Sequence, residues 1–211
     1  YFMLGESVET SAGDPNAGPE VYFTGNTFDP MRLVALLDML EQRGLLTDTA
    51  FNVVSKSGRT SETISAMLLA RERLIAAYRK QTGGRATDAD PEAWRQNIIA
   101  TTGPDPATSV LRRMHGESPF FGVLPIPDGV GGRFSAVSPV GLLFLGVTAH
   151  DQTPNQRIQE AVAGVREAHA MFLSDPAKGG NPACDLAAWL HLAETRCARN
   201  AIVLYNYADT P

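Results

Sequence analysis

The first 125 residues alternate between short apolar runs and longer segments in which apolar residues recur every three or four positions. The longer segments have the spacing of a helix with one buried face. They predict helices over residues 31–42, 61–81 and 106–114. The short runs predict strands over residues 21–24, 50–54, 97–101 and 120–124. Apolar strands that alternate with helices are typical of parallel sheets with right-handed crossovers. We therefore expect an α/β fold with a doubly wound, mainly parallel sheet flanked by helices.

The second half of the chain has a different pattern. Residues 134–149 are almost wholly apolar, which predicts a buried helix rather than an amphipathic one. Two more polar helices are expected over residues 153–173 and 181–197. The apolar run at residues 201–205 predicts one further buried strand.

Composition narrows the classes of function. The chain has 211 residues, of which 44% are hydrophobic and 19% charged, and this is ordinary for a globular protein. We expect a sugar-phosphate-binding domain over residues 1–150, then a helical segment and the start of an incomplete second domain over residues 151–211. The net charge of −5 argues against a nucleic-acid partner, which requires a basic surface. No apolar stretch approaches the length of a membrane span, so no membrane partner is expected.

Two cysteines, Cys184 and Cys197, lie in no His/Cys cluster with metal-ligand spacing. We expect them to be reduced thiols of a cytoplasmic protein, and we expect no metal site.

A loop rich in hydroxyl groups joins the strand at 50–54 to the long helix that follows. Its hydroxyl side chains are Ser55, Ser57, Thr60 and Ser61. Gly58 lets the backbone bend close to an anion, and Lys56 and Arg59 add positive charge. The helix start contributes unpaired N–H groups and partial positive charge. The spacing of a nucleotide P-loop is missing, so the pattern favours a phosphate monoester of a small molecule. The residues alone equally allow a loop whose hydroxyls only cap the helix.

A second segment, Gly131-Gly132-Arg133, precedes the apolar run at 134–149. Two adjacent glycines allow a close approach to the backbone, and Arg133 places a cation at the border of an apolar segment. Such a cation needs a partner. The partner is either a carboxylate, such as that of Asp128, or the anionic part of a ligand.

Together these segments resemble the glucose-6-phosphate isomerase family. Residues 55–63 look like the family's sugar-isomerase (SIS) phosphate loop, and residues 127–142 resemble its Val-Gly-Gly-Arg signature. Residues 23–30 are similar to its Asn-x-Asp-Pro turn, and residues 203–209 to a later strand. The resemblance is closest to the bacterial form, including one fused to transaldolase. It implies a flavodoxin-like, three-layer SIS domain.

The resemblance also implies three sets of site residues. The sugar phosphate is expected to be held by Ser55, Ser57 and Thr60. The catalytic residues are expected to be Arg133, which stabilises the negative charge of an enediol intermediate, and Lys56 beside the phosphate. The backbone is expected to approach the substrate at Gly58, Gly131 and Gly132.

By the same resemblance the parent enzyme interconverts glucose 6-phosphate and fructose 6-phosphate in glycolysis and gluconeogenesis. It requires no cofactor and acts as a homodimer on a hexose 6-phosphate. The reaction needs a carboxylate base, and the family's glutamate follows the strand that resembles residues 203–209. We therefore expect this chain to be a partial enzyme that binds the sugar phosphate with negligible turnover.

Two other interpretations stay open. One is a non-catalytic SIS module that senses or binds a sugar phosphate. The other is a different isomerase, or a transaldolase-fused enzyme, that shares these motifs.

Overall fold

The computed structural model describes residues 19–25, 28–81, 93–149, 153–199 and 201. The chain divides into two compact units, residues 1–158 and residues 159–211. The boundary between them falls inside a helix, and the domain division expected at residue 150 stays a prediction. Among the described residues no helix combines the length and the apolar character that a membrane crossing needs.

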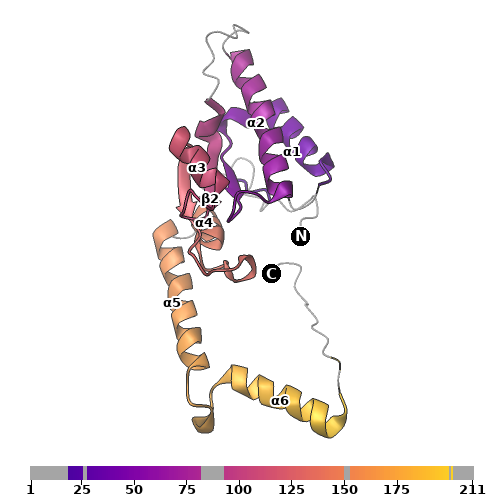
Figure 1. The fold of residues 1–211 in the computed structure, drawn as a ribbon, viewed down its shortest axis with the longest axis vertical. Helices are drawn as coiled ribbons and strands as arrows, with labels where there is room; N and C mark the ends of the chain where they lie inside the picture. Colours follow the sequence, from indigo (N-terminus) through magenta and orange to yellow (C-terminus); the bar gives the residue numbers. More distant parts are fainter. Residues whose placement is uncertain (1–18, 26–27, 82–92, 150–152, 200, 202–211) are drawn as a thin grey trace. The chain divides into compact units, whose positions relative to one another are not determined.

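The first unit is built on a three-stranded parallel sheet in the order β1-β2-β3 (Figure 1). Its strands are β1 (Phe51–Val54), β2 (Ile98–Thr102) and β3 (Gly122–Pro125). Val53 pairs with Ala100, and Ala100 pairs with Val123 in turn. Because all three strands are parallel, their carboxyl ends lie at one edge of the sheet. The predicted α/β class with a parallel sheet is confirmed.

Helices flank this sheet and supply most of its core. They are α1 (Met31–Gln42), α2 (Ser61–Gln81), α3 (Val110–Glu117) and α4 (Pro139–Val147), with 3₁₀ turns at Leu46–Asp48, Ala93–Asn97 and Gly132–Phe134. Leu37 of α1, Leu74 of α2 and Ile98 of β2 are fully buried in one cluster. The bounds of α1 and α2 agree with those predicted from the apolar spacing, since that spacing turns a whole face of each helix toward the core.

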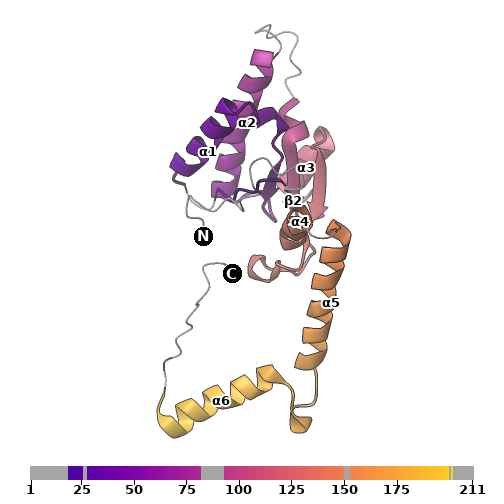
Figure 2. The same ribbon diagram turned by 180° about the vertical axis from the view of Figure 1, so that it is seen from behind.

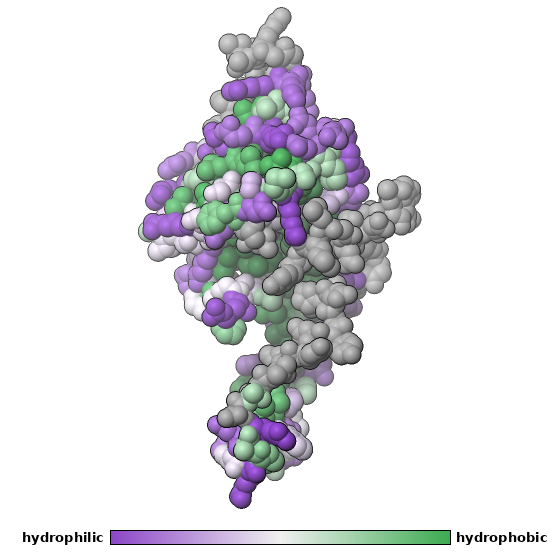
Figure 3. All heavy atoms as spheres, turned by 90° about the vertical axis from the view of Figure 1, so that its right-hand side faces the viewer, coloured by the Kyte–Doolittle hydropathy of each residue, from purple (hydrophilic) through white to green (hydrophobic). Residues whose placement is uncertain are grey.

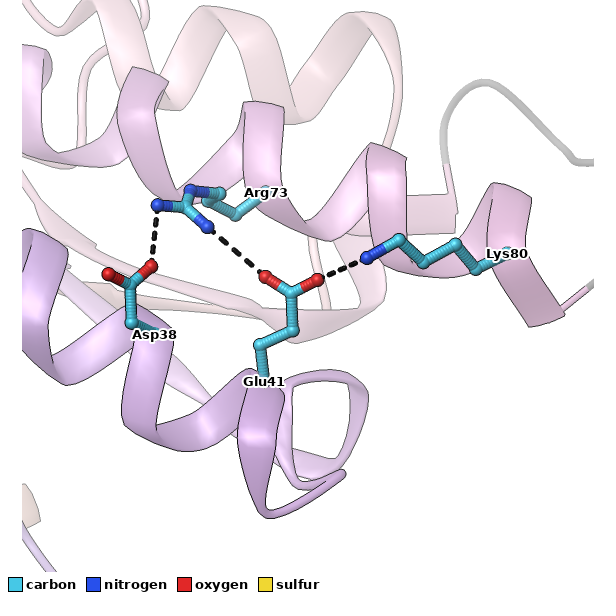
Figure 4. Close-up of polar contacts among 4 residues, drawn as sticks. All are labelled: Asp38, Glu41, Arg73 and Lys80. Carbon is cyan, nitrogen blue, oxygen red and sulfur yellow. Dashed lines mark hydrogen bonds and ion pairs between the residues drawn. The ribbon is translucent and has the colours of Figure 1, made fainter.

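An ion-pair network joins α1 to α2 (Figure 4). Arg73 of α2 donates to Asp38 at 2.7 Å and to Glu41 at 3.1 Å, both on α1. Lys80, two turns further along α2, donates to the other oxygen of the Glu41 carboxylate. Asp38 and Glu41 are three residues apart on one helix face, so one arginine can reach both. The network thus links two helices that lie side by side, as Figure 2 shows from behind.

The prediction of a strand over residues 21–24 is wrong, because these residues have no strand structure. Side chains hold the segment instead: the ring of Phe23 packs edge-on against Phe144 of α4, with 5.1 Å between centroids, and the Tyr22 hydroxyl donates to Glu20 at 2.7 Å. A strand requires a backbone partner as well as a suitable sequence, and this segment pairs with no strand among the described residues.

The buried helix expected over residues 134–149 is also wrong in extent and in burial. It begins only at Pro139, because Ser138 caps it by accepting the N–H of Val140 at 3.3 Å. Gly146 is its one buried residue, and Phe134 before it is 75% exposed. Apolar content alone does not bury a helix, since burial needs another element packed on each apolar face. Similarly, α3 begins at Val110 rather than residue 106, because Ser109 is its N-cap.

The second unit contains most of α5 (Pro154–Phe172), a 3₁₀ turn (Pro176–Lys178) and α6 (Pro182–Cys197), close to the two helices expected there. Asn181 holds the connection: its amide donates to the carbonyls of Phe172 and Ser174, both at 2.9 Å, and its oxygen caps α6. Neither helix buries a residue, and hydrophobic surface is visible on α6, the lowest helix in Figure 3. The strand expected at 201–205 lies outside the described residues, apart from Ala201.

The core packing predicts a specific difference between two leucines of α2. Leu74 is fully buried, whereas Leu68 is 46% exposed. We expect Leu74→Ala to lower the free energy of unfolding by about 2–5 kcal/mol through lost burial and a cavity. Leu68→Ala, the matched control, should lower it by about 1 kcal/mol or less. Urea unfolding followed by circular dichroism measures both, and equal losses would contradict the assigned helix face.

The network in Figure 4 predicts an acid-dependent contribution to stability. The hydrogen bond from Lys80, its charge, and the contacts of Arg73 hold the pKa of Glu41 below its ordinary value. A carboxylate with a lowered folded pKa stabilises the fold above its unfolded pKa, about 4.3, and that contribution is lost as pH falls through the folded value. Glu41→Gln should therefore lower the melting temperature at neutral pH, with the difference disappearing in acid.

The matched control is Glu72→Gln, because the Glu72 side chain is 72% exposed on α2 and pairs only with its neighbour Arg71, at 3.4 Å, among the described residues. If the difference in melting temperature between Glu41→Gln and the unmodified chain stayed constant with pH, Glu41 would not be held by these cations in solution.

Candidate functional site

The two segments that the sequence singled out meet at the carboxyl edge of the sheet. The hydroxyl loop (residues 55–60) follows β1, and the arginine loop (residues 126–134) follows β3. Lys56 of the hydroxyl loop donates through Nζ to the carbonyl of Val130 in the arginine loop, at 3.0 Å. Between them, the N–H of Gly103 after β2 donates to the Lys56 carbonyl at 2.9 Å. Strand order thus brings together residues more than seventy positions apart.

Hydrogen bonds inside the hydroxyl loop set its shape. The hydroxyls of Ser55 and Thr60 pair with each other at 2.8 Å, and Ser55 is almost fully buried. Gly58 donates its N–H to the Ser55 carbonyl at 3.2 Å, and the Ser57 hydroxyl accepts the N–H of Arg59 at 3.2 Å. Ser55 therefore shapes the loop from inside, whereas Ser57 and Thr60 lie on its exposed side.

Several backbone donors of this loop and of the start of α2 have no hydrogen-bond acceptor among the described residues. Within the described part of the chain, no acceptor is recorded for the N–H groups of Lys56, Ser57, Thr60, Ser61, Glu62 and Thr63. The carbonyl of Thr60 accepts from Ile64 at 2.9 Å, so the helix begins at this point. A 21-residue helix adds partial positive charge at its N-terminus. Such an arrangement can bind the oxygens of an anion.

The floor of the loop is a buried hydroxyl pair that sequence reasoning missed. Thr102 is fully buried. Its hydroxyl oxygen lies 2.6 Å from the Ser55 carbonyl oxygen and 2.6 Å from the Ser109 hydroxyl oxygen. Since a hydroxyl donates one proton and the carbonyl can only accept, Thr102 donates to Ser55 and Ser109 donates to Thr102. The N–H of Val110 donates to the Ser57 carbonyl at 3.0 Å. The loop therefore rests on the N-terminus of α3.

One signal could have pointed to this floor: two threonines end an otherwise apolar strand, and Gly103 follows them. A Cβ built on Gly103 would lie 2.9 Å from the Lys56 carbonyl, which is too close. Gly58 is constrained in the same way, with φ +63 and a Cβ position 2.7 Å from the Leu111 nitrogen. Packing on α3 therefore requires a glycine at position 58, and the close approach of its backbone to an anion stays a prediction.

Arg133 lies on the 3₁₀ turn of the arginine loop and is exposed. No ion pair involves it among the residues that the structure describes, so the alternative pairing with Asp128 is not observed there. Gly132 leaves open space at its Cβ position, and at Gly131 an added Cβ would make only ordinary contact with Phe134. The close approach expected at Gly131 and Gly132 stays a prediction.

No group of three His, Cys, Asp or Glu side chains in the described ranges is arranged to bind a metal. Cys184 and Cys197 are both free thiols. What the site offers chemically is therefore a set of N–H and hydroxyl donors with an exposed guanidinium on the arginine loop.

The chain matches no protein-family model. Several curated relatives are glucose-6-phosphate isomerases, however. That of Carboxydothermus hydrogenoformans is 36% identical over 194 residues, which are 92% of this chain and 36% of the relative. That of Rubrobacter xylanophilus is 32% identical over 192 residues, 91% of this chain and 38% of the relative. The chain belongs to the glucose-6-phosphate isomerase family. It spans little more than a third of the length of these relatives.

A solved structure supports the fold of this family member. The crystal structure of a hypothetical protein from Thermus thermophilus is 28% identical, with a TM-score of 0.64. The match covers 85% of this chain and 37% of that protein. The family that the sequence motifs suggested is thus confirmed, while the SIS name for the domain and the fusion to transaldolase stay predictions.

The packing of the hydroxyl loop predicts a difference between two glycines with positive φ. Gly58→Ala should cost about 3 kcal/mol of stability, because it combines left-handed strain with a clash against α3. Gly44 has φ +69 but open space around it, so Gly44→Ala should cost only the strain, about 1 kcal/mol. Urea unfolding of both variants measures the difference. Equal costs would mean that the loop is not packed on α3.

Proposed function

We propose that this chain is the sugar-phosphate-binding part of a glucose-6-phosphate isomerase, and that it binds hexose 6-phosphates. The observation that carries the proposal is the set of backbone N–H groups without acceptors in the described chain, namely those of Lys56, Ser57 and Thr60 to Thr63. Unsatisfied donors at the start of a long helix favour a dianionic phosphate through hydrogen bonds and the helix dipole. Family membership supports a sugar phosphate as the source of that anion.

Within this proposal the three hydroxyls have different roles. Ser57 and Thr60 are exposed and donate to the phosphate oxygens. Ser55 is buried and paired with Thr60, so it acts through that pair. When Ser55 donates to Thr60, the Thr60 proton is free to point at the ligand. The buried serine thus orients the hydroxyl that binds.

Arg133 is the proposed catalytic cation. Isomerisation between an aldose and a ketose passes through an enediolate, whose negative charge needs a fixed positive group. Arg133 has no ion-pair partner in the described chain, and it lies on the loop that Lys56 contacts. A phosphate held by the hydroxyl loop would fix the sugar so that its reacting carbons meet this guanidinium.

The carboxylate base is proposed to come from outside residues 1–211. The chain then supplies the anchor and the cation, and on its own it binds substrate without measurable turnover. In the longer protein we propose a cytoplasmic homodimer acting in glycolysis and gluconeogenesis. A non-catalytic sugar-phosphate module remains the alternative, and no observation in the described residues favours it.

Titration with fructose 6-phosphate tests the proposal. We expect calorimetric binding and a raised melting temperature for the unmodified chain, since a ligand that binds the folded state stabilises it. Ser57→Ala should weaken binding about tenfold through one lost charge-assisted hydrogen bond, and Arg133→Ala by a similar factor.

The matched controls are Ser65→Ala, exposed on the same helix, and Arg32→Ala, exposed on α1. Both should bind as the unmodified chain does. Absence of binding by the unmodified chain, or equal affinity in Ser57→Ala, would refute the proposed anchor.

A further inference from the structure

The hydroxyl loop and the arginine loop belong to strands that are not neighbours. Strand β2 lies between β1 and β3, so the ends of the two outer strands are about 10 Å apart at ordinary strand spacing. Backbone ladder bonds cannot join two loops across that gap. The side chain of Lys56 does join them, by its hydrogen bond to the Val130 carbonyl at 3.0 Å.

Gly103 makes this crossing possible. It follows β2, directly between the two loops, and its N–H donates to the Lys56 carbonyl at 2.9 Å. A side chain at this position would collide with that same carbonyl, since a Cβ would lie 2.9 Å from it. The Thr102 hydroxyl oxygen also lies 3.2 Å from the Lys56 carbonyl oxygen. The backbone of Lys56 is therefore held at the end of β2.

Hydrogen bonds within the arginine loop continue the connection to Arg133. Val130 donates its N–H to the Pro127 carbonyl at 3.3 Å, and Phe134 donates to the Gly131 carbonyl at 3.0 Å. The Ser135 hydroxyl donates to the Gly132 carbonyl. The hydrogen bond from Lys56 to the Val130 carbonyl therefore attaches to a turn that is itself held by internal hydrogen bonds before and after Arg133.

We propose that Lys56 is a positioning residue, whose ammonium ties the arginine loop to the hydroxyl loop and so sets Arg133 relative to a bound phosphate. This inference rests on the proposed function of the same site. It assigns Lys56 a role different from the catalytic one predicted from the family resemblance. In this role the ammonium does not contact the ligand, and it affects binding only by holding the arginine loop.

Binding of two ligands separates this role from direct contact with the phosphate. Inorganic phosphate uses the hydroxyl loop alone, whereas fructose 6-phosphate also uses Arg133. Lys56→Met keeps most of the aliphatic chain and removes the donor. This variant should weaken the binding of fructose 6-phosphate about tenfold more than it weakens the binding of inorganic phosphate, as measured by calorimetry. In an Arg133→Met background this preferential loss should disappear, because the two residues act through one contact.

Lys178→Met is the matched control, since Lys178 is an exposed lysine in the second unit. Equal weakening of both ligands by Lys56→Met, or a preferential loss that persists in Arg133→Met, would overturn the positioning role while leaving the proposed function intact. If the unmodified chain bound neither ligand, the proposed function itself would fail, and the role of Lys56 with it.

A measurement without ligand tests the tie directly. Millisecond hydrogen exchange should be faster at the amides of Val130 and Phe134 in Lys56→Met than in Lys178→Met. These amides are bonded within the arginine loop, so their exchange reports its order. Unchanged exchange in Lys56→Met would show that the lysine does not hold this loop.

Discussion

The hydroxyl of Thr102 connects the end of β2 with Ser109, seven residues later, and with Ser55, 47 residues earlier. It is buried at the end of the central strand, where it donates to the Ser55 carbonyl and accepts from Ser109 at the start of α3. A buried hydroxyl without partners would be costly, so this geometry holds only while all three parts stay in place. This contact holds the Ser55 backbone in place, and with it the start of the hydroxyl loop.

Hydrogen bonds within the protein also hold the hydroxyl loop above this contact. Its carbonyls accept from Gly58, Val110 and Gly103, and several of its N–H groups have no acceptor among the described residues. Preorganised donors of this kind need little rearrangement when an anion binds, which favours affinity and transition-state stabilisation. In the site that we propose, the exposed guanidinium of Arg133 completes the set from the loop after β3, which Lys56 contacts at the Val130 carbonyl.

Local sequence predicted some elements closely and failed at others for identifiable reasons. Helices α1 and α2 were predicted to the residue because their apolar spacing and end signals are local properties. The strand at 21–24 was wrong because pairing with a distant strand, not propensity, decides whether a strand forms. The helix expected from Phe134 was wrong because Ser138 and Pro139 define a later start. Its apolar composition said nothing about which elements would pack on it.

By itself, the sequence determined the fold class, the hydroxyl groups available in the loop and, through its motifs, the family. All of these follow from residue types at fixed spacings. Only the tertiary structure decided that Ser55 is buried against Thr60, that Gly103 makes room for the Lys56 carbonyl, and that Lys56 reaches Val130. The physical reason is that the contacts of Gly103 and Lys56 depend on the parallel pairing β1-β2-β3, which places the ends of three separate strands at one edge, while the burial of Ser55 depends on the elements packed around the loop. A local sequence pattern does not say which loops become neighbours, because the pairing of distant strands sets the distance between them.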